Sequence, residues 1–562
     1  MPPVITVDSQ RPHWSEAVGH PLRSLNTLRY LHAAQIVNRA VRTVDPLDVI
    51  PSAGAALLLP RAAVRPAEEG AEAFDGRSFS FLNRRAPFCG DDRWHPAGAD
   101  ALWIYNLQYF RYIWGMAPSD AQQLVVDWMA TNTTPRSAAW QPYPISLRVR
   151  EWIEWLLAHG DAAETFRHAM ARSITQQIEA LARQLEFHLM GNHLLENAIT
   201  LCWAGLSFAG ARANAWTEQG LTVLRAQLQQ QVLPDGVHDE RSPMYQALVT
   251  EAALRLAEVA KRSARVQARE IRELASTAGH AMLGSLERMV HPDGGYALLN
   301  DTAHGVAPSL ASLQARFGGP AEPSIRRGAW MLEGAGYCGY DNGEGLYLVF
   351  DNGPIGPDHQ PGHGHADTLS FELSHRNRRL ITDTGVMTYN GGRIRQHDRS
   401  TAAHNTIEID GRDQSELWGS FRCARRPSVS RGSAENHRDG GLLAGGYCGP
   451  GRGVPSETHT RQISVGPWLV SATDRIAAAG RHRATIRLHL APGLRARRAG
   501  RGWAIEERDG RSVATLVSDA LEWKESITAY HPEFGREIAR TSLAAHAAFR
   551  DTLAAKWWLI LK

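Results

Sequence analysis

The sequence predicts an α+β protein with at least two domains, in which a helical half is followed by an antiparallel β-sandwich. At 562 residues the chain exceeds the size that one hydrophobic core usually supports. Apolar residues recur near the helical period of about 3.6 from residue 102 to residue 290. After about Pro292, glycine pairs and short alternating segments replace that pattern. Strands that follow one another without intervening helices favour a sandwich.

The helical half begins with a densely aromatic segment at 102–114. Further segments with helical periodicity follow at 121–129, 145–159, 162–189, 193–209, 213–230, 242–260 and 268–289. Successive helical hairpins of this kind are typical of a bundle, a solenoid or an incomplete α/α toroid. The residues before them form a weakly patterned lead-in that is partly helical at 22–42. The predicted domains are therefore 1–90, 91–325 and 326–562.

The second half contains short segments of alternating polar and apolar residues. The clearest predicted strands are 346–350, 368–373, 462–465, 469–473 and 484–490. Their spacing and the turn residues between them are typical of antiparallel pairing.

Composition excludes several classes of protein. Apolar residues make up 43% of the chain and charged residues 21%, which is ordinary for a globular protein. No apolar run approaches the ~20 residues of a membrane span. A net charge of +3 is too small to imply a nucleic-acid partner. The five cysteines include no CxxC pair and are expected to be free thiols. The N-terminus lacks the apolar stretch of a secretory signal, which predicts a cytoplasmic location for the chain as given.

A histidine-rich motif in the second half predicts a metal site. The motif is Pro-Gly-His-Gly-His-Ala-Asp at 361–367, and a strand and a returning strand that ends at Asp383 follow it. An antiparallel hairpin would place His365 near Asp383, and His404 directly precedes another predicted strand. Two imidazoles and a carboxylate at one end of a sheet suit Zn²⁺. The alternative is that these are scattered surface histidines in a chain that has 24.

Two helix starts in the first half carry polar side chains. Asn192 is expected at a helix cap, and His193 and Glu196 lie on one face of the helix that follows. The alternative is an N-cap with a buried polar network. Ser242 and Pro243 begin another helix, which places Tyr245 in its first turn. There the helix dipole is expected to favour the phenolate and lower its pKa. The alternative is a tyrosine packed in an ordinary core.

Aromatic and arginine side chains are candidates for binding a ligand. Tyr143 belongs to a set of aromatic residues that could stack on sugar rings, although such residues more often form core. Arg148 and Arg399 belong to a set of arginines suited to bidentate contacts with carboxylate or sulfate. A solvated surface explains most of that set equally well.

Three longer motifs identify a family resemblance. They are Trp-Gln-Pro-Tyr-Pro-Ile-Ser-Leu-Arg at 140–148, the histidine motif extended to 359–367, and Arg-Ser-Thr-Ala-Ala-His-Asn-Thr at 399–406. With them the chain resembles the heparinase II/III-like polysaccharide lyases, which include related alginate lyases. The resemblance implies an incomplete α/α toroid followed by an antiparallel β-sandwich, with the active site in the cleft between them.

The resemblance also implies a reaction and roles for individual residues. The reaction is β-elimination at a 4-linked uronic acid of an acidic polysaccharide. Asn192 and His193 would contact the carboxylate or the C5 region, with support from Glu196. Tyr245 would be the acid, and for one uronate epimer also the base, while His363 would be the partner base. A structural zinc would bind His365, Asp383 and His404, or alternatively both His363 and His365.

Other readings of the sequence remain open. An α/α toroid can also carry a glycoside hydrolase with paired carboxylates, or a protein that binds acidic polysaccharide without cleaving it. Family members that degrade external polymers are secreted, so the resemblance implies the periplasm or cell envelope. The sequence predicts no oligomeric state.

Overall fold

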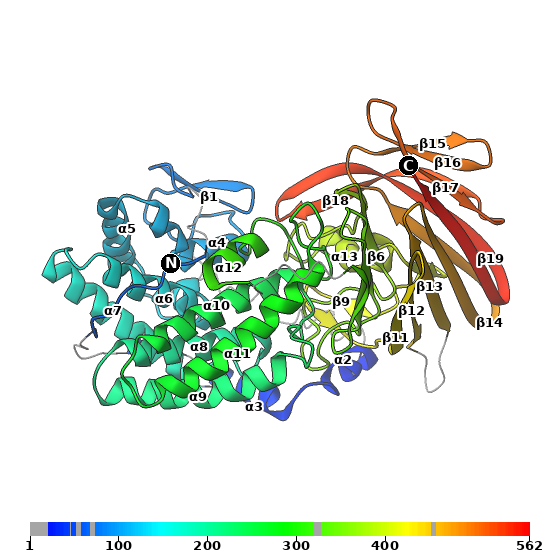
Figure 1. The fold of residues 1–562 in the computed structure, drawn as a ribbon. Coiled ribbons are helices and arrows are strands. Elements are labelled where there is room, and N and C mark those ends of the chain that lie inside the picture. Colours follow the sequence, from blue (N-terminus) through cyan, green and yellow to red (C-terminus); the bar gives the residue numbers. More distant parts are fainter. Residues whose placement is uncertain (1–20, 45–46, 52–57, 68–72, 320–326, 451–456) are drawn as a thin grey trace.

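A computed structural model describes residues 21–44, 47–51, 58–67, 73–319, 327–450 and 457–562. Helices occupy the first half of the chain and strands the second, and the two halves lie side by side (Figure 1). The predictions about an N-terminal signal and about a boundary at 325/326 concern positions outside these ranges. Within the same ranges, no helix combines the length and apolar character needed to cross a bilayer.

The helical half is an incomplete α/α toroid. Its helices are α4 (Ala101–Tyr109), α5 (Pro118–Thr131), α6 (Pro142–Ala158), α7 (Glu164–Arg183), α8 (Gly191–Ser207), α9 (Ala211–Gln231), α10 (Pro243–Lys261), α11 (Ala268–Leu286) and α12 (Leu310–Phe317). Helices α4, α6, α8 and α10 contact one another in that order, whereas α5 contacts α7 and α9 contacts α11. Alternate helices therefore form two layers, as the hairpin pattern of a toroid requires.

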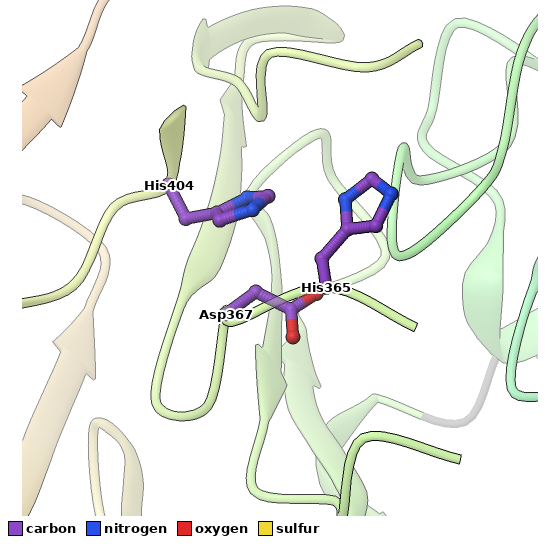
Figure 2. A group of neighbouring side chains, drawn as sticks. All are labelled: His365, Asp367 and His404. Carbon is purple, nitrogen blue, oxygen red and sulfur yellow. The ribbon is translucent and has the colours of Figure 1, made fainter. Parts of the chain in front are cut away.

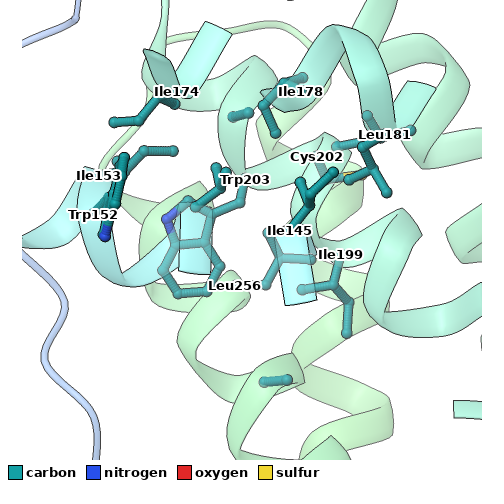
Figure 3. Close-up of a cluster of buried hydrophobic side chains, with 14 of the residues drawn as sticks. Ile145, Trp152, Ile153, Ile174, Ile178, Leu181, Ile199, Cys202, Trp203 and Leu256 are labelled. Atoms are coloured by element: carbon teal, nitrogen blue, oxygen red, sulfur yellow. The ribbon is translucent and has the colours of Figure 1, made fainter. Parts of the chain in front are cut away.

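The core of the toroid lies between these layers. Aliphatic and aromatic side chains from α6, α7, α8 and α10 interleave there, as Figure 3 shows. They include Ile145, Trp152, Ile178, Trp203 and Leu256, all of which are fully buried. Burial of each large apolar side chain contributes about 1.5–3 kcal/mol, so this cluster holds the inner layer that supports the cleft.

Two predicted helices are shorter in the structure. The first aromatic segment breaks at Phe110, whose φ of 62° ends α4 in the left-handed region. The segment predicted at 162–189 leaves the helix after Arg183. The loop that replaces its last turn carries Glu186 and His188 toward the cleft. Periodicity extended across this loop because its apolar residues continue the helical spacing by chance.

The second half is an antiparallel β-sandwich. One sheet has the order β3-β4-β5-β6-β7, formed by Gly328–Leu332, Tyr337–Asp341, Tyr347–Asp351, Phe371–His375 and Arg378–Ile381. The larger sheet has the order β11-β12-β13-β14-β19-β17-β16-β15. Its strands are Ser428–His437, Gly440–Cys448, Thr458–Gly466, Leu469–His489, Arg536–Leu561, Ser512–Ser518, Gly502–Glu506 and Arg495–Ala499. In addition, β8 (Ile407–Ile409) pairs with β14, and β18 (Trp523–Glu533) pairs with β19.

The inner faces of the two sheets share one apolar core. Phe350 and Phe371 of the smaller sheet belong to the same cluster as Ile463 and Trp557 of the larger sheet. The segments predicted as separate strands at 469–473 and 484–490 are one strand, β14. An irregularity between Ala478 and Arg481, with Gly480 at φ 108°, interrupts the alternation that the sequence shows there.

The lead-in contacts both halves. Its helices are α2 (Pro21–Leu28) and α3 (Ala33–Val44), and a hairpin of β1 (Ser78–Phe81) and β2 (Arg84–Pro87) follows. Trp418 of the short strand β9 (Leu417–Trp418) donates to the Thr27 hydroxyl at 3.1 Å. Arg42 donates to the backbone carbonyl of Gln184 in the helical half at 2.7 Å. Helices α2 and α3 therefore bridge the toroid and the sandwich (Figure 1).

Candidate active site

A cleft of about 2420 Å³ lies between the helical half and the sandwich. Helices α3, α6, α8 and α10 line it, together with the segments at 358–363, 387–392 and 418–423. The predicted catalytic residues all line this cleft: Asn192, His193, Glu196, Tyr245 and His363. The fold therefore brings together residues that are up to 171 positions apart in the sequence, from Asn192 to His363.

Tyr245 and His363 face each other across the cleft. Ser242 caps α10 by accepting a hydrogen bond from the Tyr245 backbone N–H, and Pro243 follows the cap, as the sequence predicts. The Tyr245 ring lies 4.1 Å from the His363 ring, measured between centroids. Its hydroxyl forms a hydrogen bond of 3.0 Å with the hydroxyl of Tyr389. A residue from each half thus contributes to one pair.

The structure reverses the predicted direction of the Tyr245 pKa. Burial raises this pKa well above its usual value, and Tyr389, Asp301 and Glu240 raise it further. Desolvation and nearby negative charge outweigh the helix dipole, which acts only over the first turn. Tyr245 is therefore protonated at neutral pH, which suits a proton donor.

Asp301 holds His363 in place. Its Oδ2 accepts from His363 Nδ1 at 2.8 Å and from Arg395 Nη2 at 2.7 Å. Its Oδ1 accepts from Arg395 Nη1 and, at 2.9 Å, from His365 Nε2. Despite complete burial, Arg395, His363 and His365 hold the Asp301 pKa well below its usual range. An ionised carboxylate only accepts, so His363 donates from Nδ1, while its Nε2 lies 3.7 Å from Glu240 Oε2.

Asn192 is bound by Glu240. Its backbone N–H donates to Glu240 Oε1 at 2.7 Å, and its Nδ2 lies 3.0 Å from each oxygen of that carboxylate. The buried Asn192 Oδ1 has no partner among the described residues. Gly191 permits this contact, because a Cβ there would lie 2.3 Å from Glu240 Oε1. The Asn192 side chain is thus not the helix cap that the sequence predicts, since α8 already starts at Gly191.

The rest of the α8 face is held by ion pairs. His193 Nδ1 lies 3.1 Å from Glu186 Oε1, and this carboxylate raises the His193 pKa although burial opposes the charged form. Tyr143 packs on His193 with ring centroids 4.3 Å apart. Glu196 Oε2 forms an ion pair with Arg150 Nη2 at 2.6 Å. Glu196 therefore supports the wall of the cleft, and Tyr143, predicted as a candidate for stacking on sugar rings, lines the same wall.

Two predicted substrate-binding arginines do not reach the cleft. Arg148 is 0% exposed and donates to Gln177 and to two backbone carbonyls. Its guanidinium group also packs over the Trp128 ring. Arg399 of α13 (Arg393–Arg399) is 1% exposed and donates to backbone carbonyls of Gly364, Pro361 and Ser420. Both guanidinium groups form their hydrogen bonds within the protein and connect neighbouring segments. The sequence alone does not distinguish an arginine with this structural role from one that binds a ligand.

A second cluster of polar groups lies behind His363. One ligand atom each from His365, Asp367 and His404 lie within 4.8 Å of one another. Figure 2 shows the three side chains converging. His365 Nδ1, Asp367 Oδ2 and His404 Nε2 are buried and have no hydrogen-bond partner among the described residues. Buried polar atoms without partners are costly, so three of them aimed at one point form a candidate metal centre.

The other nitrogens of both imidazoles bind carboxylates. His365 Nε2 pairs with Asp301, and His404 Nδ1 donates to Asp383 Oδ2 at 2.7 Å. Carboxylates in this position orient histidine ligands of metals. Asp383, predicted as a ligand, thus contacts the cluster through His404, while Asp367 supplies the carboxylate oxygen that groups with the imidazoles.

Several residues of the site were not predicted as site residues. Asp301 and Tyr389 lie in segments without periodicity, and only the fold brings them to the cleft. Glu186 lies in a segment predicted as helix. Asp367 belongs to the histidine motif, and its position two residues after His365 was the feature of the sequence that could have marked it as a candidate metal ligand.

Comparison with known proteins identifies the class. Residues 103–314 match the family described as heparinase II/III N-terminus, and residues 324–557 match the family described as heparinase II/III-like, C-terminal. The chain has the toroid and sandwich of that class, and it belongs to the heparinase II/III-like family. The predicted resemblance and the predicted fold class are both confirmed.

Individual relatives agree with this assignment. The heparin-sulfate lyase of Pedobacter heparinus is 25% identical over 321 residues, which are 51% of this chain and 47% of that protein. The match thus spans about half the length of that relative. A crystal structure of heparinase III is 16% identical with a TM-score of 0.68, covering 98% of this chain and 92% of that one. A mutant of heparan sulfate lyase HepC from Pedobacter heparinus is 17% identical with a TM-score of 0.59, covering 94% and 88%. At these identities the two structures are similar to this chain in fold.

Proposed function

We propose that the chain is a polysaccharide lyase that cleaves an acidic polysaccharide by β-elimination at a 4-linked uronic acid. The observation that carries the proposal is the pair of Tyr245 and His363, with ring centroids 4.1 Å apart in a cleft between the halves. Burial and nearby negative charge raise the Tyr245 pKa, which suits an acid, and Asp301 binds His363 Nδ1 so that Nε2 is the nitrogen left for a base.

In the proposed reaction, His363 Nε2 takes the proton from C5 of the uronate. The electron pair of the C5–H bond forms the C4–C5 double bond, and the C4–O4 bond breaks. The Tyr245 hydroxyl gives its proton to the departing O4, so that the products are an unsaturated uronate and a new hydroxyl end. Tyr389, 3.0 Å from the Tyr245 oxygen, is placed to stabilise the phenolate that remains.

Asn192 and Glu240 would lower the charge on the substrate carboxylate. The C5 proton is acidic only when that carboxylate is neutralised. With Asn192 Nδ2 held by Glu240, the unpartnered Asn192 Oδ1 can accept a hydrogen bond from a protonated uronic acid. The negative charge of Glu240 favours such protonation. His193, whose pKa Glu186 raises, would supply a cation on the same wall.

A structural zinc ion is the second part of the proposal. His365, Asp367 and His404 would hold it, with Asp301 and Asp383 orienting the imidazoles. Burial raises the Asp367 pKa, with His404 and His365 offsetting part of the effect, and a bound cation would favour the anion that the site needs. Zinc there would fix the loops that carry His363. Metal analysis of Asp367→Asn and Asp383→Asn separates the two candidate carboxylates, because only loss of a ligand abolishes binding.

The test is absorbance of unsaturated uronate while the protein digests a panel of acidic polysaccharides. Tyr245→Phe is expected to reduce the rate by about 10²- to 10⁴-fold. Tyr340→Phe, in β4 outside the cleft, is the matched control and should keep full activity. Full activity of Tyr245→Phe would refute the mechanism. New reducing ends without the chromophore would indicate a hydrolase, and binding without shortening would indicate a non-catalytic protein.

A further inference from the structure

Helix α3 brings positive charge into the cleft beside the candidate catalytic residues. Arg39 and Arg42 of α3 line the cleft, as do Arg422 at the start of β10 (Arg422–Cys423) and His188 in the loop after α7. These side chains come from the lead-in, the sandwich and the toroid. Three arginines and one imidazole from three distant parts of the chain thus line one cleft, and we call this set the basic subsite.

The groups of the basic subsite act on one another. Burial and the neighbouring charge of Arg39 lower the pKa of Arg422 to about 10. Burial and then Arg42 lower the pKa of His188 to about 3, with Arg39 adding to this effect and Glu186 opposing it. His188 is therefore neutral at neutral pH, whereas the positive charges of Arg39 and Arg422 oppose each other in the cleft, and such arrangements mark candidate binding sites.

Other arginines of the cleft are neutralised by the protein itself. Carboxylate partners within 2.6 Å are found in the pairs Arg111 with Glu251, Arg150 with Glu196 and Arg255 with Glu151. Arg42 and Arg422 differ from these. Arg42 donates to the Gln184 backbone carbonyl, and Arg422 lies over the Trp418 ring at 5.4 Å. Within the described ranges, no ion pair joins either guanidinium to a carboxylate, although the more distant charge of Glu186 acts on Arg42 and opposes the lowering of its pKa by burial.

His188 adds an independent observation. Its Nδ1 is buried and has no hydrogen-bond partner among the described residues. A buried ring nitrogen without a partner is costly, and a ligand acceptor would relieve that cost. The ligand that satisfies an imidazole N–H and several guanidinium groups together is an anion.

The position of the basic subsite relates it to the catalytic pair. Arg422 directly follows Phe421, whose ring centroid lies 5.9 Å from that of His363. His188 is two residues from Glu186, the partner of His193. A polymer that places one sugar at Tyr245 and His363 would therefore extend a neighbouring sugar toward these basic groups.

We propose that Arg39, Arg42, Arg422 and His188 form a subsite for a carboxylate or sulfate on a sugar next to the one that is cleaved. This inference rests on the proposed lyase function and deepens it. The preferred substrate then carries negative charge on neighbouring sugars, as polyuronates and sulfated glycosaminoglycans do. A polymer such as hyaluronan, in which uronates alternate with neutral sugars, leaves the subsite empty.

Binding to the Tyr245→Phe protein tests the proposal without turnover. Calorimetry with size-defined oligosaccharides of alginate, heparan sulfate and hyaluronan is done for this protein and for versions that add Arg422→Gln or Arg42→Gln. Each arginine change should weaken binding of the doubly charged ligands about tenfold, as loss of one charge-assisted hydrogen bond would. Arg481→Gln, exposed on β14 with the same change in net charge, is the matched control.

The pattern of losses decides the outcome. A loss confined to alginate identifies a carboxylate as the ligand, a loss confined to heparan sulfate identifies a sulfate, and a loss with both identifies any such anion. Equal binding by the subsite variants and the control would overturn the proposal, as would an equal loss with hyaluronan. Arg42→Gln also loses the hydrogen bond to the Gln184 carbonyl and Arg422→Gln loses its contact with the Trp418 ring, so binding is compared at a temperature below the melting temperature of every variant. If the parent protein never cleaves a polymer but the subsite variants still bind the charged ligands more weakly than the control, only the lyase function is refuted. If cleavage occurs but the variants bind like the control, only the subsite is refuted.

Discussion

Replacing Asp301 by Asn should damage both stability and activity, since its carboxylate joins three buried cationic or hydrogen-donating groups. Asp301 is 0% exposed and accepts from Arg395, His363 and His365. Asn has nearly the same shape but has one oxygen where Asp has two. In either orientation of the amide, its NH₂ group would face a donor of Arg395.

The magnitude follows from these contacts. Leaving Arg395 buried without its anion should lower the free energy of unfolding by about 3–5 kcal/mol. His363 would also lose the acceptor that holds its proton on Nδ1, so that its Nε2 is no longer reliably free. Loss of a positioned base lowers kcat by roughly 10²- to 10⁴-fold. Because Asp301 is buried and does not line the cleft, KM should change much less than kcat.

The assay pairs denaturant unfolding with the initial rate of uronate absorbance. Asp293→Asn is the matched control, because Asp293 also binds an arginine, Arg379 at 2.8 Å, but at the surface. That pair should contribute at most about 1 kcal/mol. A stable Asp301→Asn protein with kcat within about twofold of the parent would refute the reasoning, since the hydrogen bonds would then neither support the core nor position His363.

Three further predictions concern other buried groups. Arg148→Met should lower the free energy of unfolding by about 1–3 kcal/mol through its lost hydrogen bonds to backbone carbonyls, without raising KM. A raised KM at an unchanged free energy of unfolding would instead indicate that Arg148 binds the substrate. Glu251 has a pKa lowered to about 2, because Arg111 outweighs burial. Its contribution of about 3 kcal/mol should be present above pH about 4.5 and lost as pH falls through about 2, so Glu251→Gln and the parent should converge in acid. A chelator should lower the melting temperature of the parent but not of His404→Ala. Bound zinc should stabilise the folded parent by about 4 kcal/mol when free zinc is 1,000-fold above its Kd. Identical shifts of the melting temperature in both proteins would refute the metal centre.

The sequence by itself determined the order and type of the elements. The change from helical to alternating periodicity separates α12 from β3, and the cap at Ser242 sets Tyr245 in the first turn of α10. These features are local, because periodicity reports which face of an element is buried and capping needs only neighbouring residues. The family resemblance likewise came from contiguous motifs.

Only the tertiary structure decided which polar residues share a site. Asp301 reaches His363 across 62 positions, and α3 brings Arg39 to the same cleft from the lead-in. Arg148 and Arg399 have the residue type of ligand-binding groups, but packing buries them against backbone carbonyls. The Tyr245 pKa moved opposite to the local expectation, because burial and distant carboxylates outweigh the helix dipole. Desolvation and charge depend on what the fold places nearby in space, which no stretch of neighbouring residues records.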